Sequence, residues 1–332
     1  PTVSSGETLL RDLAFFVSAP IGLLSFLRSG QSASEQTTAA SDSHSYGVTF
    51  LGGWEALPFD DFSPAPGVIA ARIAAQAQLQ QLATGGITVA TVEGLLRRVS
   101  SASRLKSASI ELKLGDECDR SDLVEALFRA GYDRASLVEG VGQIAVRGSV
   151  VDVFAPGLEL PLRIELFADT VSSIRTFDPG TQLSVGKLAG CTVLPVKELT
   201  LLAGEESEAT KRVRARCSEL GLPRTSATAI ESVIVEGIWT PGFEHVSPLL
   251  VGGGELLWSQ IKGNITVVVC DELACAHAAD EHDELIRERS EQACVEGKLI
   301  PEMESAFGTA TEFIGWIKES ASLFLDTAPY FG

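Results

Sequence analysis

The chain has 332 residues, 45% of them hydrophobic and 21% charged, a size and composition that fit two or three globular domains. Its 44 acidic and 26 basic residues give a formal net charge of −18, which argues against a large surface for nucleic-acid phosphates and favours a protein partner. No apolar run approaches the roughly 20 residues that a membrane span needs. Six scattered cysteines are typical of reduced thiols and predict a cytoplasmic location.

The first predicted region, residues 1–113, alternates strands with helices. After a helical start, the polar stretch Ser29–Gly47 has little to bury and is predicted to be a flexible insert. A strand (VTFLG) then precedes the proline-punctuated loop Trp54–Pro64, which is either a rigid plug on the domain surface or a binding loop. A helix is expected over Val68–Ala83, followed by a strand (ITVATV) and a helix (VEGLLRRVS). This order predicts a parallel α/β sheet.

The second predicted region, residues 114–199, is a compact α+β module. Ser121 is expected to cap a helix in which Leu123, Leu127 and Phe128 share one face. Short strands follow, separated by turns that contain proline, glycine or aspartate, and they run as far as the segment LPVKEL.

One strand of this module, Leu162–Phe167, has two chemically different faces. Its three aliphatic residues fall on one side, and Arg163, Glu165 and Phe167 fall on the other. Arginine and aromatic residues are enriched among the residues that carry binding energy. Two interpretations stay open: a partner-binding face, or a solvated outer face with one stray aromatic.

The third region, residues 200–332, is mainly helical. Helices are expected over Glu206–Leu220, Ala227–Gly237 and Asp280–Gly297, with one apolar strand (ITVVVCDE) before the last of them. A buried strand of this kind is expected to join the parallel sheet of the first region. We therefore predict one discontinuous α/β domain, residues 1–113 and 200–332, into which the module is inserted.

Asp271 and Glu272 end that apolar strand, where helicase-like enzymes place carboxylates that hold Mg²⁺ and orient water. The phosphate-binding pattern G-x-x-x-x-G-K-[ST] is absent, and the glycine run Gly252–Gly254 is not followed by a lysine. The two acids therefore cannot be credited with catalysis. The nearby cysteines and histidines fall mostly on predicted helices with mixed facing, so no metal site is predicted.

Three segments together resemble the amino-terminal region of bacterial transcription-repair coupling factors, which is itself similar to the excinuclease protein UvrB. They are WEALPFDDFSPAPGVIAARIAAQAQL, the module from GYDRASLVEG to LPVKEL, and VVVCDE with its following helix. The resemblance covers about residues 48–332 and is strongest in the module. UvrB has a long aromatic hairpin after the first segment, and its absence here favours the coupling factor. The start at Pro1 and the end soon after an apolar run predict a piece of a longer protein.

The resemblance implies a degenerate helicase-like (RecA-like) parallel-sheet domain around a module that recruits UvrA, another protein of the nucleotide-excision-repair excinuclease. It implies that Arg147, Arg163 and Phe167 bind UvrA, and that Asp271 and Glu272 are a degenerate Walker-B-like pair. The chain itself is then expected to have no enzymatic activity and no cofactor.

The resemblance also implies properties of the parent protein. The parent is expected to be an ATP-dependent DNA translocase that uses ATP and magnesium. RNA polymerase and DNA would bind through downstream domains that are missing here, and later segments would mask the module. The alternative function is that of a nucleotide-dependent DNA helicase or a DNA-repair protein like UvrB.

Overall fold

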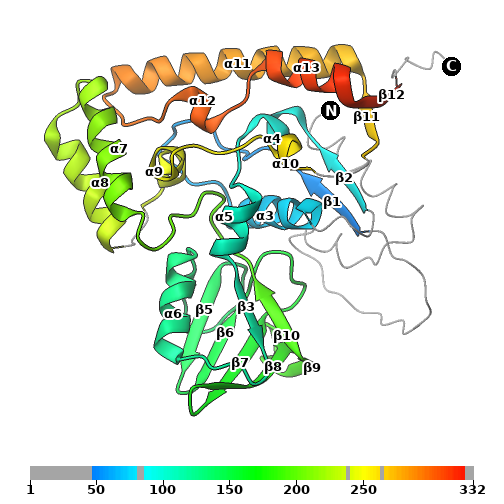
Figure 1. The fold of residues 1–332 in the computed structure, drawn as a ribbon, viewed down its shortest axis with the longest axis vertical. Coiled ribbons are helices and arrows are strands. Elements are labelled where there is room, and N and C mark those ends of the chain that lie inside the picture. Colours follow the sequence, from blue (N-terminus) through cyan, green and yellow to red (C-terminus); the bar gives the residue numbers. More distant parts are fainter. Residues whose placement is uncertain (1–46, 81–85, 237–239, 262–264, 326–332) are drawn as a thin grey trace.

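The computed structural model describes residues 47–80, 86–236, 240–261 and 265–325, which form a larger α/β body and a smaller strand-rich module (Figure 1). The fold class is therefore mixed α/β with several sheets. The predicted amino-terminal helix, and the predicted insert Ser29–Gly47 up to its last residue, lie outside the described residues.

The module runs from β3 to β10 and is built around one six-stranded sheet. Strands β4 to β9 lie in sequence order across this sheet, antiparallel except for the β4–β5 pair. Strand β10 pairs antiparallel with β3, so the segment just before residue 114 also contacts the module. The elements are β3 (Ile110–Lys113), α6 (Arg120–Arg129), β4 (Asp133–Arg134), β5 (Gln143–Arg147), β6 (Val150–Val153), β7 (Leu162–Phe167), β8 (Thr170–Phe177), β9 (Ser184–Leu188) and β10 (Gly190–Val193).

Helix α6 begins at a different cap from the predicted one. The side chain of Asp119 accepts hydrogen bonds from the N–H of Ser121 (2.6 Å) and of the next residue (3.1 Å). Asp119 and not Ser121 is therefore the N-cap, because its carboxylate satisfies two N–H groups of the first turn. Leu123 and Leu127 are buried as expected, whereas Phe128 is 39% exposed and lies outside their face.

The core of the module lies between α6, the β3–β10 pair and one face of the sheet. Period-two alternation places aliphatic residues of neighbouring strands on this face, and burying each contributes about 1.5–3 kcal/mol. The buried members include Leu112, Leu123, Leu127, Ile144, Val151, Val153, Leu162, Ile164, Leu166, Val171, Ile174 and Val193.

The body contains two separate parallel strand pairs among its described residues. Strand β1 (Gly47–Leu51) pairs with β2 (Gly86–Ala90), and β11 (Val267–Cys270) pairs with β12 (Ala321–Leu325). The expectation that the apolar strand at 267–270 joins the sheet of the first region is therefore wrong within the described residues. Its hydrogen-bond partner is instead β12, which closely follows a helix late in the chain.

Helices surround these strand pairs. The helix predicted after β2 ends early, at Leu96, because the residues that follow form extended bridges to Glu255 and Phe307. Helix α11 begins already at Glu272 and is longer than predicted. None of the described helices is long and apolar enough to cross a membrane. The helices are α3 (Pro66–Gln80), α4 (Val92–Leu96), α5 (Ala102–Ala108), α7 (Glu206–Glu219), α8 (Arg224–Glu236), η2 (Phe243–His245), α9 (Ser247–Val251), α10 (Leu257–Gln260), α11 (Glu272–Val295), α12 (Met303–Ala306) and α13 (Ala310–Ser320).

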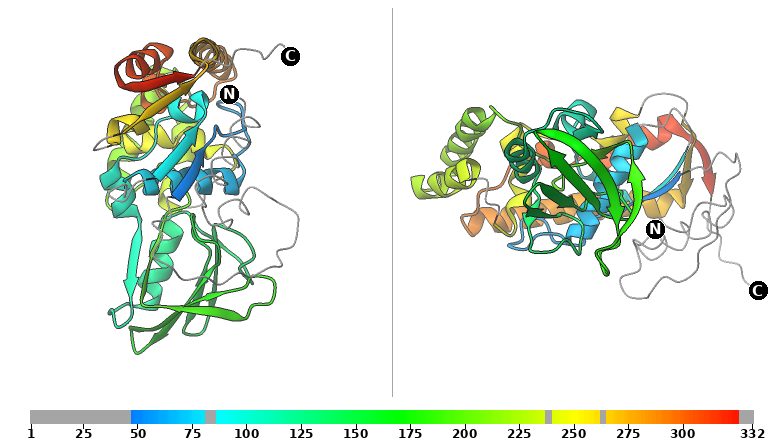
Figure 2. Two further views of the ribbon diagram at one scale, coloured as in Figure 1. Left: turned by 90° about the vertical axis from the view of Figure 1, so that its right-hand side faces the viewer. Right: turned by 90° about the horizontal axis from the view of Figure 1, so that it is seen from below.

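Segments from before and after the module pack together in the body. Val92 and Leu96 of α4 share one buried cluster with Val269 of β11 and with Phe313 and Ile317 of α13. The side view in Figure 2 shows β12 and α13 at the end of the molecule farthest from the module. The chain thus leaves the body after α5, builds the module and returns to the same body.

The returning segment is fixed to the body by the buried carboxylate of Glu198. One oxygen accepts the indole N–H of Trp54 (2.6 Å), and the other accepts the Nε–H of Arg72 on α3 (2.6 Å). The carbonyl of Glu198 also accepts the hydroxyl of Ser100 (2.6 Å). Trp54 is 4% exposed, so this part of the proline-punctuated loop is a packed structural element.

We predict that Glu198→Gln lowers the free energy of unfolding by roughly 3 kcal/mol or more, because it leaves the charge of Arg72 buried without a counter-ion. The side chains of Arg72 and Glu198 are 0% and 4% exposed, so solvent cannot compensate for the loss. Urea unfolding followed by circular dichroism measures the change.

The control for this prediction is Glu125→Gln, which removes an i,i+4 pair with Arg129 on the surface of α6. Both side chains of that pair are more than half exposed, so its contribution to stability is small. Equal unfolding free energies for the two variants would contradict the role of Glu198.

Candidate protein-binding surface

Strand β7 separates a buried face from an outward face, as the alternation predicts. Its aliphatic residues are at most 6% exposed, whereas Phe167 at its end is 77% exposed. Arg163 and Glu165 lie on the outward face with Phe167 and are partly exposed. One side of the sheet therefore belongs to the main core. The other side presents charge and an aromatic ring, and part of it is covered by a second small buried cluster that includes Ala145 and Phe177.

The sheet register aligns four charged residues in one row across this outward face. Asp152 on β6 is paired with Arg163 on β7, which is paired with Arg175 on β8 and then with Lys187 on β9. Directly paired residues share a face of the sheet and have neighbouring side chains. The row is acidic at one end and basic over its other three positions.

Arg163 is held by contacts within the module. Its Nε–H and Nη2–H groups donate to the two carboxylate oxygens of Asp152 (2.8 and 2.9 Å), and its Nη1–H donates to the carbonyl of Gln182 (3.1 Å). The guanidinium also stacks over the ring of Phe177 at 4.4 Å. The hydrogen bond to Asp152 raises the pKa of Arg163. Its forked donor pair is thus already occupied, and its side chain is 19% exposed.

Arg147 and Phe167 are more accessible. Arg147 ends β5 next to a turn at Gly148, whose φ of 58° suits glycine, and its Nη2–H donates to the carbonyl of Ser136 (2.8 Å). Phe167 precedes the Ala168–Asp169 turn, in which both φ angles are positive (48° and 55°). Such a two-residue turn follows the twist of a hairpin and leaves the adjacent ring at its tip.

The sheet brings the three predicted residues onto one side of the module. Arg163 and Phe167 are four residues apart on β7, a separation of about 13 Å along a strand. Arg147 lies two strands away, in the row that contains Val150 and Glu165. Sequence reasoning missed Asp152, Arg175 and Lys187 as members of the same surface, since only the register aligns them with Arg163. The three predicted residues remain proposed binding residues.

Asp271 serves as the N-cap of α11 in this structure. Its Oδ1 accepts the N–H of Ala274 (2.9 Å), while Glu272 occupies the first turn of the helix. An acid at this position stabilises the exposed N–H groups and positive end of a helix without any metal. Within the described residues, no group of three or more histidine, cysteine or acidic side chains could hold a metal ion.

In the glycine run Gly252–Gly254 of the body, backbone N–H groups donate hydrogen bonds to carbonyls of the fold. Gly253 donates to the carbonyl of Pro248 (2.7 Å), and Gly254 donates to that of Ser305 (2.9 Å). A phosphate cradle needs such groups to be available to the ligand. Two of these glycines line an open groove of about 320 Å³ together with Arg212 and Arg216 on α7.

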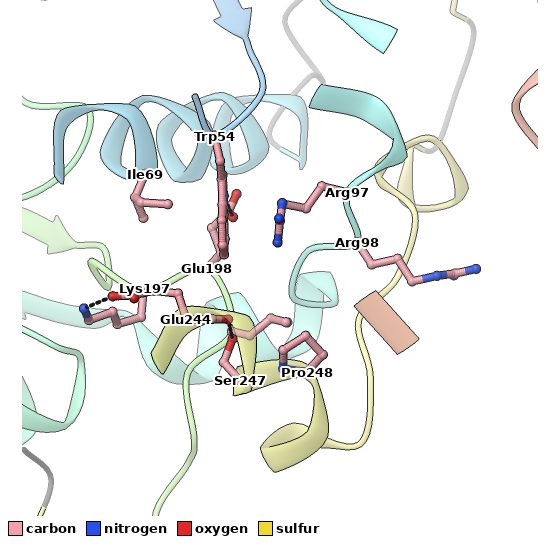
Figure 3. Close-up of a pocket in the computed structure, with 10 residues that line it drawn as sticks. Trp54, Ile69, Arg97, Arg98, Lys197, Glu198, Glu244, Ser247 and Pro248 are labelled. Carbon is pink, nitrogen blue, oxygen red and sulfur yellow. Dashed lines mark hydrogen bonds and ion pairs between the residues drawn. The ribbon is translucent and has the colours of Figure 1, made fainter. Parts of the chain in front are cut away.

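A second cavity lies beside the carboxylate of Glu198 (Figure 3). Its volume of about 10 Å³ is at the lower limit of what can hold a single water molecule, and it is too small for a nucleotide. Arg97 points toward Trp54, with its guanidinium 3.3 Å from the ring centroid, whereas Arg98 points away from it. Burial lowers the pKa of Arg97 to about 9, so this guanidinium stays cationic near neutral pH.

Two buried histidines lie near Arg97. His245 accepts the N–H of Phe59 on Nδ1 (3.3 Å), and its Nε2 has no hydrogen-bond partner in the described structure. His282 lies against Phe307, with ring centroids 5.7 Å apart, and its Nδ1 is likewise without a partner. Burial, assisted by the positive charge of Arg97, lowers the pKa of each histidine to about 4.

Comparison with known proteins identifies relatives of both the module and the wider chain. Residues 110–199 match the family described as the UvrB interaction domain. The chain is 33% identical over 189 residues to the transcription-repair-coupling factor of Myxococcus xanthus, covering 57% of this chain and 16% of that protein. The corresponding protein of Mycobacterium tuberculosis is 31% identical over 249 residues, covering 70% of this chain and 20% of that protein.

A protein of Escherichia coli is also a relative of this chain. This transcription-repair-coupling factor is 28% identical over 241 residues, covering 72% of this chain and 21% of that protein. The chain therefore spans about a fifth or less of the length of the curated relatives that it matches. The family match begins at the first residue of β3, so it includes the strand that pairs with β10.

We predict that the free energy of unfolding falls as the pH is lowered from 6.5 toward 4. Over this range the unfolded chain protonates His245 and His282, whose ordinary pKa is 6.5, while the folded chain keeps both neutral. Each histidine contributes a slope of up to about 1.4 kcal/mol per pH unit. Urea unfolding at several pH values measures it.

The control compares the chain with a variant carrying both His245→Gln and His282→Gln. Between pH 6.5 and 5 this variant is expected to show a flatter dependence of stability on pH. Carboxylates such as Glu244, whose pKa is held below 4.5, titrate at lower pH and leave this window clear. An unchanged slope in the double variant would show that other groups cause the dependence.

Proposed function

The chain carries a UvrB interaction domain and is a relative of the transcription-repair-coupling factors, and from this premise we propose that it recruits the excinuclease protein UvrA to sites of stalled transcription. It acts as a non-catalytic interaction module within a longer DNA translocase. The observation that carries the proposal is the outward face of the six-stranded sheet. There Phe167 is 77% exposed, on the same face as Arg147 and Arg163.

The chemistry of this face suits a protein partner. An exposed aromatic ring fills an apolar pocket at an interface, and neighbouring arginines pair with carboxylates around it. Arg147 meets the partner directly, because its side chain is exposed at the end of β5. Arg163 contributes positive charge from a fixed position, because Asp152 and Phe177 hold its guanidinium in place.

Two features of the body favour a non-catalytic role. The glycine run uses its N–H groups within the fold, and Asp271 caps a helix.

We also infer a cytoplasmic location, because all six cysteines are free thiols and a reducing compartment preserves that state.

We predict that Phe167→Ala and Arg147→Ala each weaken binding of purified UvrA by about 2 kcal/mol or more, close to thirtyfold in Kd. The reason is the loss of an apolar anchor in the first variant and of a charge-assisted hydrogen bond in the second. Isothermal titration of UvrA into each variant measures the loss.

The matched control is Arg129→Ala, which removes an exposed arginine from α6 in the same module. It is expected to bind like the unmodified chain. Arg163→Ala requires a thermal unfolding curve beside the titration, because it leaves the buried carboxylate of Asp152 without its partner. Failure of the unmodified chain to bind UvrA, or full affinity of the Phe167 variant, refutes the proposal.

A further inference from the structure

The charged row across the outward face places like charges directly opposite each other. Arg163 on β7 is paired with Arg175 on β8, and Arg175 is paired in turn with Lys187 on β9. The Cβ atoms of directly paired residues lie about 4.5–5.5 Å apart, and like charges in such positions destabilise a sheet. The module therefore keeps three neighbouring cations at a cost to its own stability.

Acidic residues within the module compensate these three cations unequally. Arg163 donates to both carboxylate oxygens of Asp152 (2.8 and 2.9 Å). Arg175 has one described ion pair, with Glu165 at 3.8 Å, which is too long for a hydrogen bond. Lys187 is exposed and forms no hydrogen bond or ion pair with any described residue. Positive charge is therefore compensated at β6 and β7 and left without a partner at β9.

Recognition at this end of the sheet must come from side chains. The register of β8 with β9 skips Val185, which is therefore the extra residue of a bulge. The carbonyl of Ala189, just after β9, already accepts the N–H of Leu114 (2.9 Å). The main chain of β9 is thus not available to a further strand. What it presents is the charge of Lys187 beside the aliphatic side chains of Leu183 and Val185, which are 69% and 65% exposed.

From this geometry we infer that Arg175 and Lys187 bind a carboxylate on an acidic segment of UvrA. Their paired positions allow both groups to reach one carboxylate, which relieves the repulsion between them. Arg175 supplies a planar fork of donors, and Lys187 supplies a compact ammonium group. The inference rests on the proposed function, and it extends the binding surface from β7 to β9.

The pattern of charge favours this occupant over two others. A nucleic acid presents a negative charge about every 1.7 Å along its axis and needs an extended row of cations. This patch offers only two cations, and the carboxylates of Asp152 and Glu165 lie on the same face. A second copy of the chain carries a further charge of −18, so repulsion between the copies opposes dimerisation. A single acidic segment of a protein avoids both penalties.

The test measures the affinity of UvrA by isothermal titration for variants that change only charge. Lys187→Gln is expected to raise Kd about fivefold and to make it less dependent on salt, and Lys187→Glu to raise it about tenfold or more. Lys187→Arg keeps the charge and is expected to keep the affinity. The matched control is Lys113→Gln on β3, which removes another exposed lysine on the opposite side of the sheet. It is expected to bind like the unmodified chain.

Urea unfolding of the same variants separates binding from a structural role. Lys187 lies opposite Arg175, so removing its charge relieves repulsion within the sheet. Lys187→Gln is therefore expected to raise the urea concentration at the midpoint of unfolding while it weakens binding. A lower midpoint would show that Lys187 supports the fold, and would overturn the inference.

The outcomes also separate this inference from the proposed function. If UvrA loses affinity for Phe167→Ala but binds Lys187→Gln and Lys187→Glu as tightly as the unmodified chain, only the inference fails. If the unmodified chain does not bind UvrA, both fail. Equal losses for Lys187→Gln and Lys113→Gln would show nonspecific attraction and overturn the inference. Binding of duplex DNA that Lys187→Gln abolishes, with UvrA affinity unchanged, would assign the patch to phosphates and overturn it as well.

Discussion

One buried carboxylate, that of Glu198, fixes the segment that returns from the module to the body. It joins three parts of the chain that are distant in sequence: the loop at Trp54, the helix that carries Arg72 and the segment that returns from the module. A charge removed from water is tolerated when its partners satisfy it, and here both carboxylate oxygens have one. Arg97 packs on Trp54 beside this carboxylate, and a narrow cavity lies next to them.

On the outward face of the sheet a charged side chain is likewise satisfied by partners within the fold, but with more exposure to solvent. The pairing of Arg163 with Asp152 fixes a cation within the sheet, so little side-chain freedom remains for a partner to restrict. Such preorganisation lowers the entropic cost of binding. Phe167 and Arg147 remain exposed around it, and the cationic character extends through Arg175 toward β9. A fixed charge between accessible groups is an arrangement suited to protein recognition.

The faces of strands and the positions of helices were predictable from the sequence, whereas the choice of cap residue and the nonlocal pairings were not. The two faces of β7 follow from period-two alternation over six residues, and α7 and α8 follow from helical periodicity. The Asp119 cap differed from the prediction because Ser121 and Asp119 are both competent caps, and the choice depends on which N–H groups each reaches. The partner of β11 depends on a strand far along the chain. The occupied fork of Arg163 depends on hairpin register, which residue types alone do not specify.

The module is inserted in the body, so the polypeptide crosses between them twice, once after α5 and once through the segment that contains Glu198. A domain on a single tether can swivel about that tether. Two crossings, with an ion pair buried at the second, oppose this rotation. Under the proposed function, a partner bound to the sheet therefore acquires a defined orientation relative to the body as well as a position.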